Sequence, residues 1–244
     1  MYSPSHFREL PEVVKNLLII NGLLFLATIS LEKYGFNIVE HLALHQFQSI
    51  NFKPHQLITH LFMHGNFTHL FFNMFALWMF GKILENIWGP KRFLIFYMIT
   101  GVGAAFIHLG ISQYEILSLQ SQLDPYNLMT ILNDGKSILE MNQNYSNPIM
   151  GKLNLLINTP TVGASGAVFG LLLAFGMLFP NSLLYIYFAV PIKAKYFVIG
   201  YGLLELFAGL SNNPADNVAH FAHLGGMIFG FLMIKYWQRN NNLY

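Results

Sequence analysis

Six long apolar stretches constrain the fold of this chain more than any other feature of its sequence. They cover approximately residues 12–31, 66–86, 92–110, 164–180, 194–210 and 217–237. About 20 apolar residues in a helix cross a bilayer, and a helix satisfies its own backbone hydrogen bonds there. Only 10% of the 244 residues are charged, against about 25% in a typical soluble domain. The sequence therefore predicts an all-α, polytopic membrane protein with a single domain of six helices over residues 1–244.

The composition also excludes several classes of function. The chain has no cysteine, so disulfides and thiolate catalysis are ruled out. Its net charge is only +2, which indicates no nucleic-acid partner. Arg8, Glu9, Glu12 and Lys15 lie before or in the first turn of the first apolar stretch, and no small-residue cleavage site follows it. We therefore expect an uncleaved first membrane span rather than a signal peptide.

The distribution of basic residues predicts the orientation in the membrane. One arrangement of the six helices places nine of the 13 Lys and Arg residues on the same side. Because basic residues favour the cytoplasmic side, we expect both termini in the cytoplasm. The absence of cysteine and of an organelle-targeting segment leads us to expect a bacterial inner membrane. The nine residues are Arg8, Lys15, Lys82, Lys91, Arg92, Lys193, Lys195, Lys235 and Arg239.

Two long connections are expected on the other, extracytoplasmic side. Residues 32–65 place five histidines among apolar residues, which favours short helices in the membrane interface. Residues 111–160 have a patchy amphipathic character. This second segment either lies on the membrane surface or is mobile, and the sequence does not decide between the two. The five histidines are His41, His45, His55, His60 and His64.

The first motif is the string from Gly163 to Gly170, GASGAVFG, which opens the fourth apolar stretch. Ser165 stands between Gly163 and Gly166, and these small neighbours allow a backbone or a substrate to approach it closely. A short helix that begins at Ser165 would place free backbone N–H groups beside the hydroxyl, where an oxyanion can bind. The simpler alternative is a helix contact made by small residues, which is common in membranes.

The second motif is AHLGGMIFG, in which Gly226 and Gly230 follow His223 at three and seven residues, on the same helical face. If this glycine face packs against that of Gly166 and Gly170, His223 comes within reach of Ser165. Histidine can then remove the proton of the serine, which is otherwise a weak nucleophile. The alternative for His223 is a structural polar contact between helices.

No acidic partner for His223 is evident in the sequence. Asp216 is seven residues earlier, a rise of roughly 10 Å along a helix, and His220 is not a carboxylate. Glu205 belongs to the fifth apolar stretch, where we interpret it as a protonated or locally paired acid. We therefore expect a Ser165–His223 dyad without an acid.

His69 and Asn73 lie four residues apart near the start of the second apolar stretch and share a helical face. Neutral imidazole and amide groups donate hydrogen bonds, so both side chains are candidates to stabilise an oxyanion. The alternative is a polar contact between helices.

With these three motifs in order, the chain resembles the rhomboid family of intramembrane serine proteases. The motifs are GxSG, AHxxGxxxG and His64-x4-His69-x3-Asn73. The resemblance implies that Ser165 is the nucleophile and His223 the base, with His69 and Asn73 as oxyanion donors. It also implies six helices, a site open to water from the outer face, and substrates that are transmembrane helices.

The chain departs from the family pattern at three places. Phe169 stands where many members have a tyrosine that packs against the catalytic histidine, so the ring is kept and the hydroxyl lost. His55-Gln56 replaces a Trp-Arg pair in the first outer connection. Residues 111–160 exceed what the common core needs.

Our interpretation is an intramembrane serine endopeptidase that acts in membrane lipid on transmembrane protein substrates and needs no cofactor. Two alternatives are kept. One is an inactive rhomboid-like protein that binds transmembrane helices without cutting them. The other is a metal site, which we disfavour because no cysteine or helical carboxylate pair completes the ligand set. Its histidines would be His60, His64, His69, His220 and His223.

Overall fold

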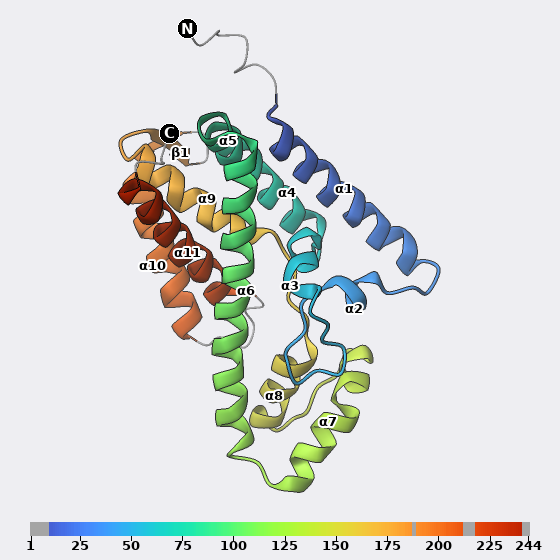
Figure 1. Ribbon diagram of the computed structural model, residues 1–244. Coiled ribbons are helices and arrows are strands. Elements are labelled where there is room, and N and C mark those ends of the chain that lie inside the picture. The colour runs from blue at the N-terminus through green and yellow to red at the C-terminus, as the bar shows by residue number, and fades with distance from the viewer. Residues whose placement is uncertain (1–9, 187–188, 212–217, 241–244) are drawn as a thin grey trace, which may run out of the picture.

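The computed structural model describes residues 10–186, 189–211 and 218–240, and this part of the chain is a bundle of helices (Figure 1). Helix α1 is Glu12–Glu32. The second membrane helix, Phe67–Trp88, is continuous and is made of α4 (Phe67–Ala76), a π-helical turn η3 (Leu77–Gly81) and α5 (Lys82–Trp88). It is followed by α6 (Pro90–Gln120). These three helices are long and apolar enough to cross a membrane, which confirms the prediction of an all-α, polytopic membrane protein.

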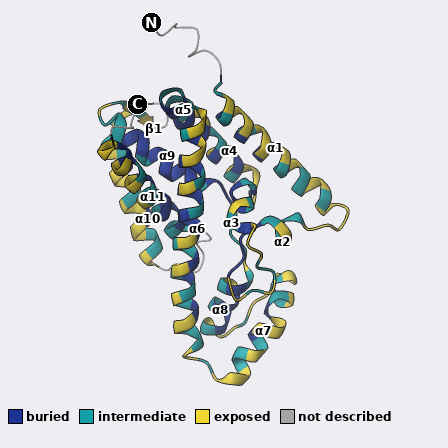
Figure 2. Ribbon diagram, viewed as in Figure 1, coloured by how far each residue is buried: buried dark blue, intermediate teal, exposed yellow. Residues whose placement is uncertain are grey.

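The other three of the six predicted helices are α9 (Ser165–Leu178), α10 (Ala194–Ser211) and α11 (His220–Arg239). Helix α9 is the centre of the bundle and packs against α4, α6, α10 and α11, so it is coloured almost entirely as buried in Figure 2. Its 14 residues span about 21 Å, less than the ~30 Å of a hydrocarbon core. The fourth helix is therefore short and starts at Ser165, as predicted.

Glycines bring α9 and α11 into backbone contact. A Cβ atom on Gly226 would lie 1.8 Å from the carbonyl oxygen of Gly166, and one on Gly230 would lie 3.2 Å from that of Gly170. On its other side, a Cβ on Gly166 would lie 2.5 Å from the Cβ of Ala104 in α6. The expected meeting of the two glycine faces is therefore present, and α9 is held between α6 and α11.

Helix α1 is fixed by a buried carboxylate rather than by glycines. Glu85 of α5 is 3% exposed and accepts hydrogen bonds from the backbone N–H groups of Val13 (2.9 Å) and Val14 (2.7 Å). The first N–H groups of a helix have no partner within it, and this carboxylate binds two of them. Its negative charge is also attracted to the positive end of the helix dipole.

The connection 32–65 contains α2 (Ile38–Leu42), α3 (Gln56–Thr59) and the 3-10 turn η2 (His60–Phe62), as the sequence predicts short helices there. Its organising residue is Gln56, which is fully buried. The amide of Gln56 accepts from the N–H groups of His45 and Lys53 and donates to the carbonyls of His41 and Asn51. The departure from the family pattern at His55-Gln56 thus places a hydrogen-bonding amide at the centre of this loop.

Residues 111–160 fold into packed helices, and whether they lie on the membrane surface stays a prediction. Helix α6 continues to Gln120 rather than ending at residue 110, and α7 (Pro125–Glu140) and α8 (Pro148–Asn158) follow it. Figure 1 shows these two helices beside the far end of α6. They enclose a small apolar core of their own, formed by Ile116, Ile131, Met150, Leu153 and Ile157.

Ion pairs join this unit to its surroundings. Lys136 of α7 pairs with Glu40 of α2, and Lys152 of α8 pairs with Glu115 of α6. The Lys136 ammonium, which donates a hydrogen bond to Glu40, lowers the pKa of that carboxyl. The two long connections are therefore in contact with each other.

A short antiparallel hairpin, β1 (Leu183–Ile186) and β2 (Val190–Lys193), joins α9 to α10 at the opposite end of the bundle. The sequence did not predict it. The extent of the domain over residues 1–244 stays a prediction, and Arg8 and Asp216 lie outside the described residues.

The contact between α9 and α11 predicts that Gly226→Ala destabilises the protein. The new methyl group would meet a backbone oxygen that cannot rotate away, so the helices must separate, and we expect a loss of about 3 kcal/mol. The measurement is thermal unfolding of the purified protein in detergent. The matched control is Gly200→Ala in α10, where no atom lies within 4 Å of the added carbon. Equal midpoints for the two variants would contradict the prediction.

Candidate active site

Ser165 is the first residue of α9 and follows a loop whose backbone requires glycine. Gly163 has φ +129°, a conformation that favours glycine, and its N–H donates to the carbonyl of His60 at 3.0 Å. A Cβ on Gly163 would also lie 2.8 Å from Cε1 and Nε2 of His69. This position therefore needs glycine for its backbone angle and for the space that the imidazole occupies.

His223 reaches Ser165 from α11. Its Nε2 lies 2.9 Å from the Oγ of Ser165, a hydrogen-bond distance. The ring of Phe169, one turn along α9 from Ser165, stacks on the imidazole with centroids 4.1 Å apart and planes 7° apart. The aromatic contact expected at the position of the family's tyrosine is thus made by phenylalanine.

A carboxylate contacts the other side of His223, contrary to our expectation of a dyad without an acid. The Oε2 atom of Glu205 lies 2.8 Å from Nδ1 of His223 and 2.7 Å from Nδ1 of His220. Glu205 is 6% exposed. Glu205 was not expected at the site because it lies on a different helix, 18 residues from His223. The available signal was a lone carboxylate in an apolar helix, which is costly in a membrane unless it is paired.

His69 lies beside the loop that precedes Ser165, and Asn73 lies one turn further from it along α4. The imidazole of His69 is beside Gly163. The N-cap of its helix is Asn66, whose side chain accepts from the N–H of His69 at 2.8 Å. Asn73 is one turn further along α4 and is 6% exposed. One of its amide N–H groups donates to the carbonyl of His69 at 2.9 Å, which leaves the second for another acceptor.

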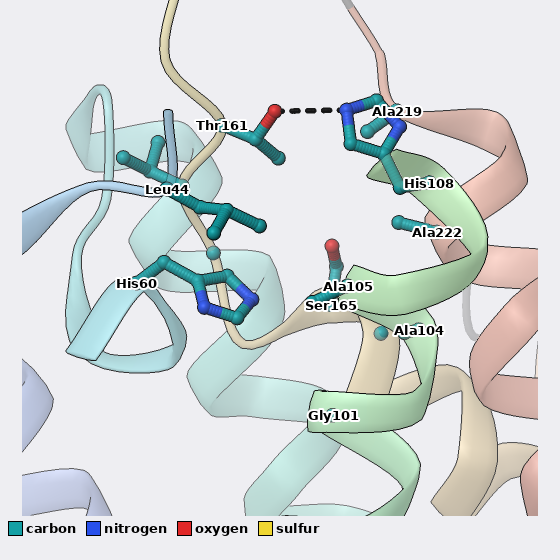
Figure 3. Close-up of a pocket in the computed structure, with 13 residues that line it drawn as sticks. Leu44, His60, Gly101, Ala104, Ala105, His108, Thr161, Ser165, Ala219 and Ala222 are labelled. Carbon is teal, nitrogen blue, oxygen red and sulfur yellow. Dashed lines mark hydrogen bonds between the residues drawn. The ribbon is translucent and has the colours of Figure 1, made fainter. Parts of the chain in front are cut away.

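A small cavity adjoins the hydroxyl of Ser165 (Figure 3). Its polar groups come from His60, His108 and Thr161, and Nε2 of His108 is 2.9 Å from the hydroxyl of Thr161. Burial lowers the pKa of His60 to about 4, so this ring is neutral at pH 7. The cavity walls below Ser165 are small residues, which are Gly101, Ala104 and Ala105 of α6.

Among the described residues, one group has the composition of a metal site, formed by Glu205, His220 and His223. It shares two histidines with the metal site that we disfavoured from the sequence, whereas His60, His64 and His69 are not part of it. Oε2 of Glu205 is 2.7–2.8 Å from each Nδ1, whereas bond lengths to a tetrahedral zinc place neighbouring ligand atoms about 3.3 Å apart. The distances fit hydrogen bonds better than shared coordination.

Comparison with known proteins gives the family. The model of the Rhomboid domain matches residues 51–239. The chain belongs to the rhomboid family. It is 29% identical over 182 residues to RHOMBOID-like protein 12, mitochondrial, of Arabidopsis thaliana, which covers 72% of this chain and 45% of that protein. It is therefore an integral membrane protein of that family.

Two further rhomboid proteins are similar to this chain. Rhomboid protein 1, mitochondrial, of Saccharomyces cerevisiae is 27% identical, with 72% of this chain and 40% of that protein covered. Rhomboid protease AarA of Providencia stuartii is 28% identical, with 71% and 52% covered. This rhomboid chain thus spans about half the length of the curated relatives it matches.

The stacking of Phe169 on His223 predicts a loss of serine reactivity in Phe169→Ala. Without the ring, the imidazole is free to turn away from Ser165, and a misplaced base slows the reaction by about a hundredfold. Phe169→Tyr keeps the ring, so we expect reactivity within about threefold of wild type because the base stays in place. The measurement is the rate of labelling by a fluorophosphonate probe.

Phe175→Ala is the matched control, because Phe175 is also a buried aromatic residue of α9 but lies two turns further from Ser165. Both alanine variants should unfold at a lower temperature than wild type. If Phe175→Ala slows labelling as much as Phe169→Ala, the effect is loss of packing and the stacking argument is wrong.

Proposed function

We propose that this rhomboid is an active intramembrane serine endopeptidase that cleaves peptide bonds in or near transmembrane segments of membrane proteins. The observation that carries the proposal is the 2.9 Å contact between Oγ of Ser165 and Nε2 of His223, at the start of a short helix in the centre of the bundle. A relative named a rhomboid protease, with 28% identity, supports it.

In the proposed first step, Oγ of Ser165 bonds to the carbonyl carbon of the scissile peptide and its proton passes to Nε2 of His223. The carbonyl oxygen becomes an oxyanion. The backbone N–H of Ser165 is free to bind it, because the first N–H groups of a helix have no partner within the helix. His69 and Asn73, both on α4, are the proposed side-chain donors.

The proposed tetrahedral intermediate collapses when the C–N bond breaks and the imidazolium of His223 protonates the leaving amine. A water oxygen then bonds to the acyl carbon while His223 takes a proton from the water, and the bond from that carbon to Oγ of Ser165 breaks as His223 returns the proton to Oγ. The cavity beside Ser165 offers polar partners for such a water in His60, His108 and Thr161, and an ordered water needs two to four of them.

A substrate helix must reach Ser165 from the lipid, and we propose that it enters past α10. This helix is weakly packed along most of its length. Only Ala194, Val198 and Glu205 are buried in it, and its exposed apolar residues include Leu204 (65%) and Phe207 (76%). Gly or Pro in the substrate would ease the local unwinding that exposes a peptide bond.

The proposed orientation places both termini on the cytoplasmic side, because the basic residues favour it. The expectation of a bacterial inner membrane is not supported by the comparisons, since two of the three relatives described above are named mitochondrial proteins. We therefore propose no particular membrane for this protein.

The experiment that tests the function is labelling of purified protein in detergent by a fluorophosphonate probe. We expect wild type to label and both Ser165→Ala and His223→Ala to lose at least about a thousandfold in rate, as removal of a nucleophile or its base does in other serine enzymes. Thermal unfolding of each variant serves as the control for folding. A correctly folded wild type that does not label would contradict the proposal and favour a rhomboid that binds transmembrane helices without cutting them.

A further inference from the structure

We infer that Glu205 is a positioning residue that acts on Ser165 through His223, so that the reacting unit is Ser165–His223–Glu205 rather than a dyad. The inference rests on the proposed protease function. Its basis is an unbroken line of contacts, in which Oγ of Ser165 is 2.9 Å from Nε2 of His223 and Nδ1 of the same ring is 2.8 Å from Oε2 of Glu205.

The first argument concerns the tautomer of His223. A carboxylate only accepts hydrogen bonds, so the proton of a neutral His223 must be on Nδ1, where it points at Glu205. Nε2 then carries the lone pair and faces the Ser165 hydroxyl. This is the one neutral form of the ring that can accept the serine proton.

His220 strengthens this assignment because it contacts the same oxygen. Its Nδ1 is 2.7 Å from Oε2 of Glu205, and its ring is nearly perpendicular to that of His223, at 87°. Even a protonated carboxyl could donate from this oxygen to only one of the two nitrogens. At least one imidazole must therefore donate, and an ionised Glu205 accepts from both.

The second argument concerns charge. When Oγ of Ser165 bonds to the substrate carbon, its proton moves to Nε2 of His223, which becomes an imidazolium. Glu205 keeps its negative charge and stays unprotonated, and its attraction for the imidazolium is strong because water is largely excluded there. Phe169 covers one face of the ring, so the ring is held by stacking and by a hydrogen bond at Nδ1.

The competing explanation is that Glu205 only ties α10 to α11, since polar contacts between helices stabilise membrane proteins. Stability alone cannot separate the two roles, because both predict that substitution weakens the bundle. The kinetics of the serine can separate them, because a purely structural carboxylate does not affect proton transfer.

The chain offers a matched control in Glu85. It is a second buried carboxylate, 3% exposed, which accepts two hydrogen bonds from another helix, at the N-terminus of α1. Glu85→Gln and Glu205→Gln therefore make the same chemical change to two interhelical carboxylates, only one of which contacts His223.

The experiment measures the maximal rate of inactivation and the half-saturating concentration of the fluorophosphonate probe on the full chain in detergent. For Glu205→Gln we expect the maximal rate to fall by about 10²–10⁴-fold, as in a serine enzyme whose histidine is left in the wrong tautomer. The half-saturating concentration should change less than about twofold, because the probe does not contact Glu205 in this arrangement and its binding is therefore unaffected. Glu85→Gln should keep both constants near those of wild type.

Glu205→Asp is the second variant, and it decides the question if Glu205→Gln does not fold. It keeps the charge on a shorter side chain, so we expect an intermediate rate that is clearly above that of Glu205→Gln where both can be measured.

A folded Glu205→Gln or Glu205→Asp protein that reacts at the wild-type rate would overturn the inference. If Glu205→Gln slows the reaction no more than Glu85→Gln, the carboxylate is structural and the inference fails while the proposed protease function stands. If folded wild type does not react at all, the protease function fails and this inference fails with it.

Discussion

The close backbone contact between α9 and α11 is the constraint on which the rest of this structure depends. At Gly226 the helices approach until no side chain fits between them. Because Ser165 begins α9 and His223 stands one turn before Gly226, this contact fixes the distance between their reactive atoms at 2.9 Å. Without a hydrophobic effect in lipid, such contact between small residues is a main source of helix association. The packing of the bundle and the geometry of the proposed site therefore have the same physical origin.

Buried polar groups are the second principle of the bundle, and three of them have partners outside their own helix. Glu85 is satisfied by the N-terminus of α1, Glu205 by two imidazoles of α11, and Gln56 by four backbone groups of its own loop. An unpaired polar group in lipid costs several kcal/mol. Each of these residues consequently specifies one arrangement of its elements, since any displacement leaves it unsatisfied.

The sequence predicted what local patterns encode and missed what depends on packing. Apolar length indicated the membrane helices, and the glycine spacing indicated that α9 and α11 meet at Ser165 and His223. Glu205 was set aside because no sequence spacing reveals that α10 and α11 place it against His223. The helices α7 and α8 were missed for a similar reason, since their apolar residues form a core only when they pack against each other and α6. The role of Gln56 depends on four hydrogen bonds to backbone groups of the loop, which the periodicity of the sequence does not indicate.

Helix α10 lies on the proposed route of substrate entry and also contacts the proposed base. Only three of its 18 residues are buried, and one of them is the carboxylate that contacts His223. A hydrogen bond of 2.8 Å does not survive a shift of even 1 Å. If a substrate displaces α10 on its way in, the proposed base loses its orientation for as long as the entrance is open. In the proposed mechanism, hydrolysis then begins only after α10 has returned, because substrate entry and the orientation of His223 both depend on this helix.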